Sequence, residues 1–332
     1  MSKFTAPSFS RRSFLGAALA GAAALAVVPA SFASEKAEEP QAAALDKDAF
    51  DKLLTTGPVA DDKAIEASEW ATAVKKAGKL RVGGTRTSAL FSQLDETDGK
   101  IRGFDAGLYE LLTRYILGDE SLYEITQIDS STREAVLQSD QVDCVFATYS
   151  ITPARAEVIS FAGPYYTSQQ AILVKAGNDK ISGLADLAGK IVATQAGSTG
   201  PSILAEYAPE ATVQEYGTDL EARTALEQGR VDAYVTDHTL LLNAMSKNNG
   251  VYKIVGENFG PLDSYGIGMP LGSDGVDFVN DFLKVIEDEG IWAELWHITL
   301  GDRTGVADAP EPPAIGEAEE AEEEKEEEKS SK

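Results

Sequence analysis

From Leu80 to about Leu300 the sequence alternates short strand patterns with helix patterns, and this alternation constrains the fold more than any other feature. Strand-like runs such as VDCVFAT (142–148) stand between amphipathic helical runs such as FDAGLYELLTRYI (104–116). Alternation of this kind is typical of a parallel sheet covered by helices, so we expect an α/β protein. About 220 residues of such pattern is near the upper limit for one hydrophobic core, which predicts a division into two units.

The segment 171–257 carries a complete series of strands and helices of its own. We therefore expect two α/β lobes, with residues 78–170 plus 258–302 in lobe 1 and residues 171–257 in lobe 2. Two crossing strands near 167–171 and 256–262 would link the lobes. From the pattern alone, two independent tandem domains remain an alternative.

Residues 1–33 have the pattern of an export signal. Arg11 and Arg12 precede Ser-Phe-Leu, an apolar run reaches Val28, and Ser-Phe-Ala before Ser34 suits a signal peptidase. The pattern resembles a twin-arginine signal and predicts an exported, extracytoplasmic protein; an uncleaved anchor is the alternative. The signal contains no cysteine, so the chain is not an evident lipoprotein.

Residues 34–77 are expected to be a mobile spacer, to about residue 60, followed by a helix over 61–77 that Gly78 ends. Residues 303–332 are expected to be an acidic disordered tail, because the run EEAEEEKEEEK has no apolar face to bury.

The formal net charge of −25 excludes nucleic acid as a partner, because nucleic-acid binding needs a basic face. The single cysteine, Cys144, sits in an apolar strand pattern, and the two histidines, His238 and His297, show no ligand spacing with it or with each other. We therefore expect no metal site, no cofactor and no catalytic residue.

Residues 146–165 place polar groups at the end of a strand. Thr148 and Ser150 offer hydroxyls, and Arg155 offers a planar set of donors matched to a carboxylate. The alternative is an ordinary turn in which the hydroxyls cap a helix and Arg155 forms a surface ion pair.

Five pieces in order resemble one family, the polar amino-acid substrate-binding proteins of bacterial ABC importers (family 3 extracellular solute receptors). The pieces are LRVGGTR (80–86), DGKIRGFDAGLYELL (98–112), VDCVFATYSITPARAEVISFAGPYY (142–166), LADLAGKIVATQAGSTG (184–200) and ALEQGRVDAYVTDHTLL (225–241). The resemblance covers about two thirds of the chain. It implies a type II periplasmic-binding-protein fold, with two lobes and two hinge-crossing strands, and a monomer whose partners are a small amino acid and ABC permease subunits.

The resemblance also implies a cleft site. Lobe 1 would contribute Thr148, Ser150 and Arg155; lobe 2 would contribute the three residues Ser198, Thr199 and Asp237. Unpaired amides and hydroxyls where GSTG opens a helix suit a carboxylate, and an acid suits an ammonium. Helix capping is the alternative role for the GSTG residues and for Asp237.

Arg86 follows the first strand, where GTRTS resembles the glutamate- and aspartate-binding members. In that interpretation Arg86 holds the γ-carboxylate of glutamate; in the alternative it points to solvent near Asp95 or Glu96. The sequence thus predicts a glutamate receptor for an ABC importer. The alternatives are a receptor for glutamine or another polar amino acid, an enzyme resembling cyclohexadienyl dehydratase on the same fold, and a detached sensory module.

Overall fold

The computed structural model describes residues 43–247 and 250–316. The expected export signal (1–33) and the acidic end of the tail (317–332) lie outside the described residues. Within the described part, no helix combines the length and the apolarity that a membrane span requires.

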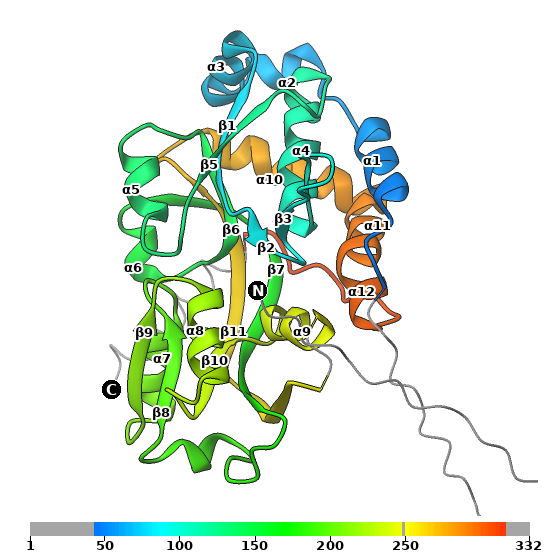
Figure 1. The fold of residues 1–332 in the computed structure, drawn as a ribbon. Helices are drawn as coiled ribbons and strands as arrows, with labels where there is room; N and C mark the ends of the chain where they lie inside the picture. The colour runs from blue at the N-terminus through cyan, green and yellow to red at the C-terminus, as the bar shows by residue number, and fades with distance from the viewer. Residues whose placement is uncertain (1–42, 248–249, 317–332) are drawn as a thin grey trace, which may run out of the picture. The chain divides into compact units, whose positions relative to one another are not determined.

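The main sheet has eight strands in the order β5-β1-β6-β11-β7-β10-β8-β9 (Figure 1). Its strands are β1 (Leu80–Gly84), β5 (Tyr123–Gln127), β6 (Cys144–Ser150), β7 (Ser160–Lys175), β8 (Ile191–Gln195), β9 (Thr212–Tyr216), β10 (Ala233–Asp237) and β11 (Tyr252–Met269). The outer pairs at both ends of the sheet are parallel, whereas β7 and β11 run antiparallel to their neighbours. The expected α/β fold with two crossing strands is confirmed.

The crossing strands β7 and β11 pair with each other along most of their length and join the two lobes (Figure 1). Their register shifts between Val255 and Phe259, between Phe259 and Asp263, and again between Tyr265 and Ile267. Irregular pairing at these points leaves fewer regular ladder bonds, so we expect the chain to bend there.

Helices cover both lobes. They are α1 (Lys47–Thr56), α2 (Asp62–Glu66), α3 (Glu69–Ala77), α4 (Phe104–Leu117), α5 (Arg133–Gln138), α6 (Pro153–Ala156), η1 (Leu184–Leu187), α7 (Gly200–Tyr207), α8 (Asp219–Glu227), α9 (His238–Lys247), α10 (Gly275–Asp288), α11 (Ile291–Trp296), η2 (His297–Gly301) and α12 (Asp302–Thr304). A small sheet of β2 (Thr87–Ser88), β3 (Ser92–Leu94) and β4 (Ile101–Arg102) follows β1.

The cores explain why two lobes form. Strands β1 and β6 are largely buried, as strands covered on both faces of a sheet usually are. The largest buried cluster runs from Phe50 to Leu300 and belongs to lobe 1. Two further clusters, all within Ala171–Phe259, lie on the two faces of the lobe 2 strands. Lobe 1 is therefore built from two stretches of chain, before and after lobe 2.

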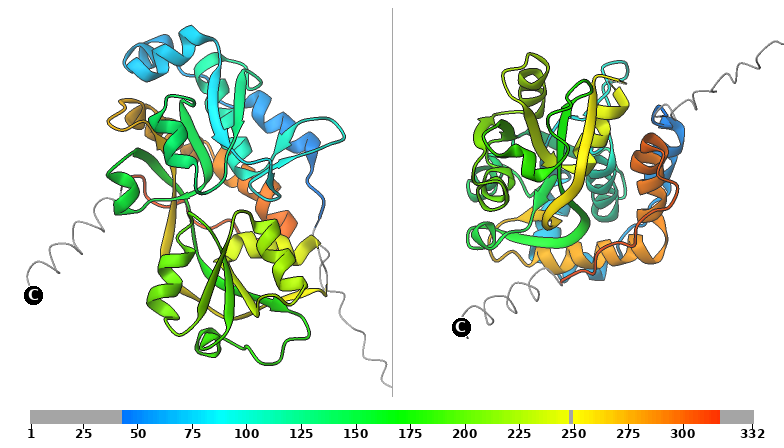
Figure 2. Two further views of the ribbon diagram at one scale, coloured as in Figure 1. Left: turned by 60° about the vertical axis from the view of Figure 1, so that its left-hand side comes forward. Right: turned by 90° about the horizontal axis from the view of Figure 1, so that it is seen from below.

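The expected mobile spacer is wrong for residues 47–60. Helix α1 begins after Asp46, whose side chain accepts a hydrogen bond from the Ala49 N–H, and Phe50, Leu53 and Leu54 are buried in the lobe 1 core. Figure 2 shows α1 (blue) beside the C-terminal helices (orange to red). The sequence after it, expected as one helix over 61–77, forms α2 and α3 instead, because Ser68 caps a new helix.

The expected tail is also wrong for residues 303–316. Ile315 packs against the lobe 1 core, and the Gly316 N–H donates to the carbonyl oxygen of Gly163, 3.0 Å away. This segment is thus attached to lobe 1, and of the expected tail only residues 317–332 lie outside the described part of the chain.

Candidate functional site between the lobes

A small polar cavity of about 30 Å³ lies where the two lobes meet. It is lined by Ser130, Arg133, Thr148, Ser150, Gln170, Gln195, Ser198, Thr199, Thr236, Asp237 and Leu240. The lining comes from the carboxyl ends of strands in both lobes, where open α/β sheets hold their ligands, and from the crossing strand β7.

Asp237 supplies a carboxylate from the end of β10. One of its oxygens accepts a hydrogen bond from the Gln170 amide and the other from the Tyr265 hydroxyl. Gln170 lies opposite Asp237 in the antiparallel pairing of β10 with β7, which places the two side chains together. Asp237 is thus held by side chains of both crossing strands, Gln170 on β7 and Tyr265 on β11.

Asp263, on β11, joins the two lobes through one carboxylate oxygen. Its Oδ2 accepts from the Ser150 hydroxyl at 3.0 Å and from the Thr199 hydroxyl at 3.2 Å. Ser150 belongs to lobe 1 and Thr199 to lobe 2, so this single acid contacts both walls of the cavity.

Two guanidinium groups of lobe 1 meet one carbonyl of lobe 2. Arg133 donates to the Gly197 oxygen at 3.1 Å and Arg155 donates to the same oxygen at 3.0 Å. Both groups also lie over the ring of Tyr149, Arg133 at 4.1 Å and Arg155 at 5.1 Å from its centroid. Arg155 further donates to the Ser150 carbonyl at 2.7 Å and pairs with Glu134 at 3.4 Å.

Burial shapes the acidity of these groups. Removal from water raises the pKa of Asp237, and the neighbouring charge of Asp263 raises it further. Burial likewise raises the pKa of Asp263, while burial and the nearby Arg155 lower the pKa of Arg133 to about 10. Two acids and two guanidinium groups thus face each other in a poorly solvated space, an arrangement suited to a zwitterion.

Five of the predicted residues line this cavity together: Thr148, Ser150, Ser198, Thr199 and Asp237. Arg155 lies directly behind Ser150 and Gly197, with its side chain 11% exposed. The expectation for Arg86 does not hold in this geometry. Its side chain is exposed, donates to the Ile125 carbonyl at 3.3 Å, and is not among the residues that line the cavity.

Sequence reasoning missed Arg133, Gln170 and Asp263. Arg133 carried a usable signal, because it opens the helix that follows β5 and so stands beyond the carboxyl end of a strand. Gln170 and Asp263 carried none, since their position depends on the register of the crossing strands.

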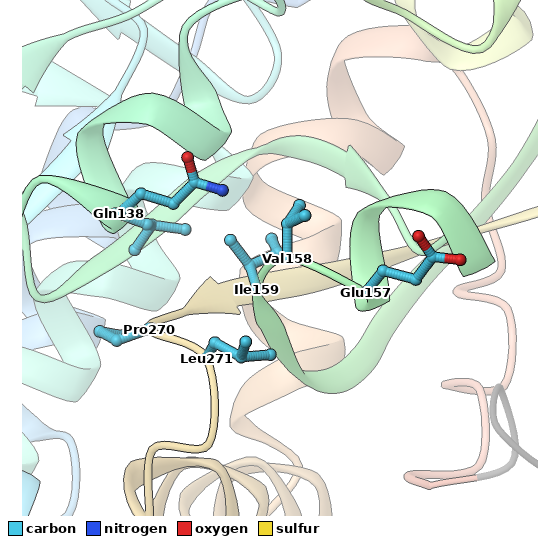
Figure 3. Close-up of a pocket in the computed structure, with 7 residues that line it drawn as sticks. Gln138, Glu157, Val158, Ile159, Pro270 and Leu271 are labelled. Carbon is cyan, nitrogen blue, oxygen red and sulfur yellow. The ribbon is translucent and has the colours of Figure 1, made fainter.

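A larger groove of about 420 Å³ lies on lobe 1 alone (Figure 3). It is lined by Leu137, Gln138, Glu157, Val158, Ile159, Pro270 and Leu271. These residues, all within the described chain, are mainly apolar and include one acid and no cation. The groove therefore offers little to a charged zwitterion, and the smaller cavity between the lobes is the better candidate site.

Comparison with known proteins agrees with the fold. The family model for bacterial extracellular solute-binding proteins, family 3, matches residues 80–297, and the chain belongs to this family of extracytoplasmic solute-binding proteins. The matched region holds every element that lines the cavity.

The chain is similar to three proteins that are named for the amino acid they bind. It is 37% identical to a glutamine-binding protein of Geobacillus stearothermophilus, over 59% of this chain and 74% of that protein. It is 32% identical to the glutamate-binding protein GluB of Corynebacterium glutamicum, over 66% and 78% respectively. The crystal structure of a solute receptor for L-cysteine from Neisseria gonorrhoeae matches with a TM-score of 0.69 at 25% identity, over 74% of this chain and 99% of that one.

The family is one of polar amino-acid binding proteins that serve ABC transporters, and the chain is a binding protein rather than an enzyme. An amino acid and a permease are therefore its partners at the level of the family. Which amino acid this chain binds is a separate question, on which the relatives differ.

Proposed function

We propose that the chain is an exported receptor that binds glutamate in the cavity between its lobes and delivers it, as a monomer, to the permease of an ABC importer. The observation that carries the proposal is the cavity wall itself, where hydroxyls from both lobes stand between buried guanidinium groups and buried acids. The GluB relative binds glutamate by its name, which agrees with this assignment.

The proposal assigns the α-carboxylate to Arg155 and to Ser198 and Thr199, which directly precede the first turn of α7. The α-ammonium is assigned to Asp237 and the Thr148 hydroxyl. Hydrogen bonds to charged groups contribute about 1.5–3 kcal/mol each. Four or five such bonds suffice for a micromolar affinity, about −8 kcal/mol, after the cost of association.

The γ-carboxylate is assigned to Arg133 in place of Arg86. Arg133 is 2% exposed, lines the cavity and has a planar guanidinium that can hold a carboxylate with two parallel bonds.

Binding requires the lobes to move. A cavity of about 30 Å³ has the volume of about one water molecule, whereas an amino acid needs several times that space. We propose that the irregular pairing of β7 and β11 provides the hinge. A ligand that contacts both lobes then favours the closed form, which the permease recognises.

Calorimetry of the purified chain with glutamate, glutamine, aspartate, arginine and cystine tests the proposal. We expect micromolar or tighter binding of glutamate and weaker binding of the other four. Glutamine binding ten times tighter than glutamate would replace the assigned ligand and leave the receptor function intact. Absence of binding to all five would overturn the proposed site.

A further inference from the structure

Thr148 lines the cavity in an unusual backbone conformation. Its φ is +42°, in the left-handed region that β-branched residues rarely adopt. Such conformations persist only where the surroundings hold them, and they are concentrated at functional sites. The contacts that hold Thr148 therefore bear on what this part of the cavity wall presents to a ligand.

The buried carboxylate of Asp105 makes the contact that holds Thr148. Its Oδ2 accepts from the Thr148 N–H at 2.9 Å, and its Oδ1 accepts from the Tyr165 hydroxyl at 2.8 Å. Asp105 stands in the first turn of α4, where the unpaired amides of the helix N-terminus favour a negative charge. The helix begins at this point because Gly103, with φ +144°, lets the chain pass against the backbone of Phe91.

We propose that Asp105 is a positioning residue of the binding site, whose carboxylate holds Thr148 in the left-handed conformation that turns it toward the ligand. This inference rests on the proposed function, since it assigns to Asp105 the geometry of one of the binding groups. Asp105 is 1% exposed and does not line the cavity, so it acts through Thr148 and not by touching the ligand.

A purely structural role explains Asp105 less well. A carboxyl in the core is costly to bury, and burial raises the pKa of Asp105 to about 6. The two donors that offset this cost are neutral: the Thr148 amide and the Tyr165 hydroxyl, whose own pKa burial raises well above its usual value. Simple packing against Phe104 and its neighbours needs no charge, whereas a charged acceptor makes a stronger bond to the Thr148 amide.

A double-mutant cycle separates positioning from general stability. Asp105→Asn keeps the size of the side chain and replaces the carboxylate by a neutral amide. We expect it to weaken glutamate binding at least fivefold at pH 7.5. In a Thr148→Gly background the same change is expected to weaken binding less than twofold, because glycine adopts positive φ without strain. Equal factors in the two backgrounds, or unchanged binding in Asp105→Asn, would overturn the proposal.

Tyr165→Phe is the matched control. It removes the other hydrogen bond of Asp105 and leaves the Thr148 amide bonded, so we expect affinity within twofold of the parent chain. A loss as large as that in Asp105→Asn would show that the whole buried cluster matters and would count against the specific contact.

Nuclear magnetic resonance of the Thr148 amide gives a readout that needs no ligand. We expect its proton shift to follow the ionisation of Asp105, with a midpoint near pH 6, and to lose this titration in Asp105→Asn. A Thr148 amide that does not titrate in the parent would overturn the contact, even if Thr148→Gly abolished binding. Failure of the proposed function is distinct, since a chain that bound no amino acid would still show the titration.

Discussion

The guanidinium of Arg155 on lobe 1 donates a hydrogen bond to the Gly197 carbonyl on lobe 2, 3.0 Å away. At the same place the Gly197 backbone approaches lobe 1 so closely that an added Cβ would lie 2.7 Å from the Cα of Ser131. The lobes thus meet backbone to backbone beside the cavity, and only a residue without a side chain permits the contact.

Gly197→Ala is expected to weaken ligand binding at least tenfold, because the methyl group keeps the lobes apart and the closed form loses its contacts. Gly189→Ala is the matched control: Gly189 also lies in lobe 2 with φ +68°, close to the +72° of Gly197, but a Cβ there meets nothing within 4 Å. Calorimetry and thermal unfolding of both variants check this. Similar losses of affinity in both would show that backbone strain, and not the approach of the lobes, is responsible.

Arg133 and Arg155 are expected to respond differently to a change of ligand. Arg133→Gln should weaken glutamate binding by about 1.5–3 kcal/mol, roughly ten- to a hundredfold, and glutamine binding much less, since only glutamate offers a γ-carboxylate. Arg155→Gln should weaken both ligands by a similar factor, because both carry the α-carboxylate. Calorimetric titration of each variant with each ligand measures the four constants.

The discriminating quantity is the ratio of the glutamate and glutamine affinities. A ratio unchanged by Arg133→Gln would refute the γ-carboxylate assignment while leaving the α-carboxylate assignment standing. Thermal unfolding should accompany the titrations, because Arg133 also donates to the Ala147 and Ser130 carbonyls at 3.2 Å each.

The part of the site that the sequence predicts lies at strand ends. The strands there have apolar patterns that can be recognised from a few neighbouring residues, and parallel strands bring their ends to one edge of a sheet. The residues that follow or end such strands are Thr148, Ser150, Ser198, Thr199 and Asp237. The order of strands and helices could be predicted from the same local patterns. Gln170 and Asp263 could not be predicted, because their place depends on the pairing of two strands about 90 residues apart.

Arg86 shows that a position directly after a strand is not enough to predict that a side chain lines the site. It follows β1 as expected but does not line the cavity, and the three short strands after it form a separate sheet. Such short strands leave almost no periodic signal. The error over residues 47–60 is different, since Phe50, Leu53 and Leu54 have the i, i+3, i+4 spacing of an amphipathic helix and the composition of the segment obscured it.

Glu110 is expected to make the stability of the chain depend on pH. It is 8% exposed in α4, its Oε1 accepts from the Tyr123 hydroxyl at 3.2 Å, and burial raises its pKa to about 8 from 4.5. Between pH 4.5 and 8 the unfolded chain releases this proton and the folded chain keeps it. Each unit by which the pH rises therefore lowers the free energy of unfolding by up to about 1.4 kcal/mol. Below this window both states are protonated, and above it both are ionised. Outside the window Glu110 therefore no longer makes the free energy of unfolding depend on pH.

Glu110→Gln keeps the acceptor for Tyr123 and removes the ionisable proton. We expect the variant to be more stable than the parent by about 4 kcal/mol at pH 8, with the difference shrinking toward pH 4.5. Urea unfolding followed by circular dichroism at several pH values measures it. A difference that is constant with pH would indicate that Glu110 is ionised in the folded chain throughout.

Phe50 tests whether the segment before the family match is part of the folded unit. It is fully buried in α1, and α1 packs against α4 in the lobe 1 core. Phe50→Ala should therefore lower the free energy of unfolding by about 3–5 kcal/mol, as truncation of a buried aromatic residue does. Val59→Ala, at a side chain 52% exposed, should change it by less than about 0.5 kcal/mol. If residues 47–60 were a mobile spacer, neither substitution would alter the unfolding midpoint, so equal midpoints for the parent and both variants would restore that interpretation.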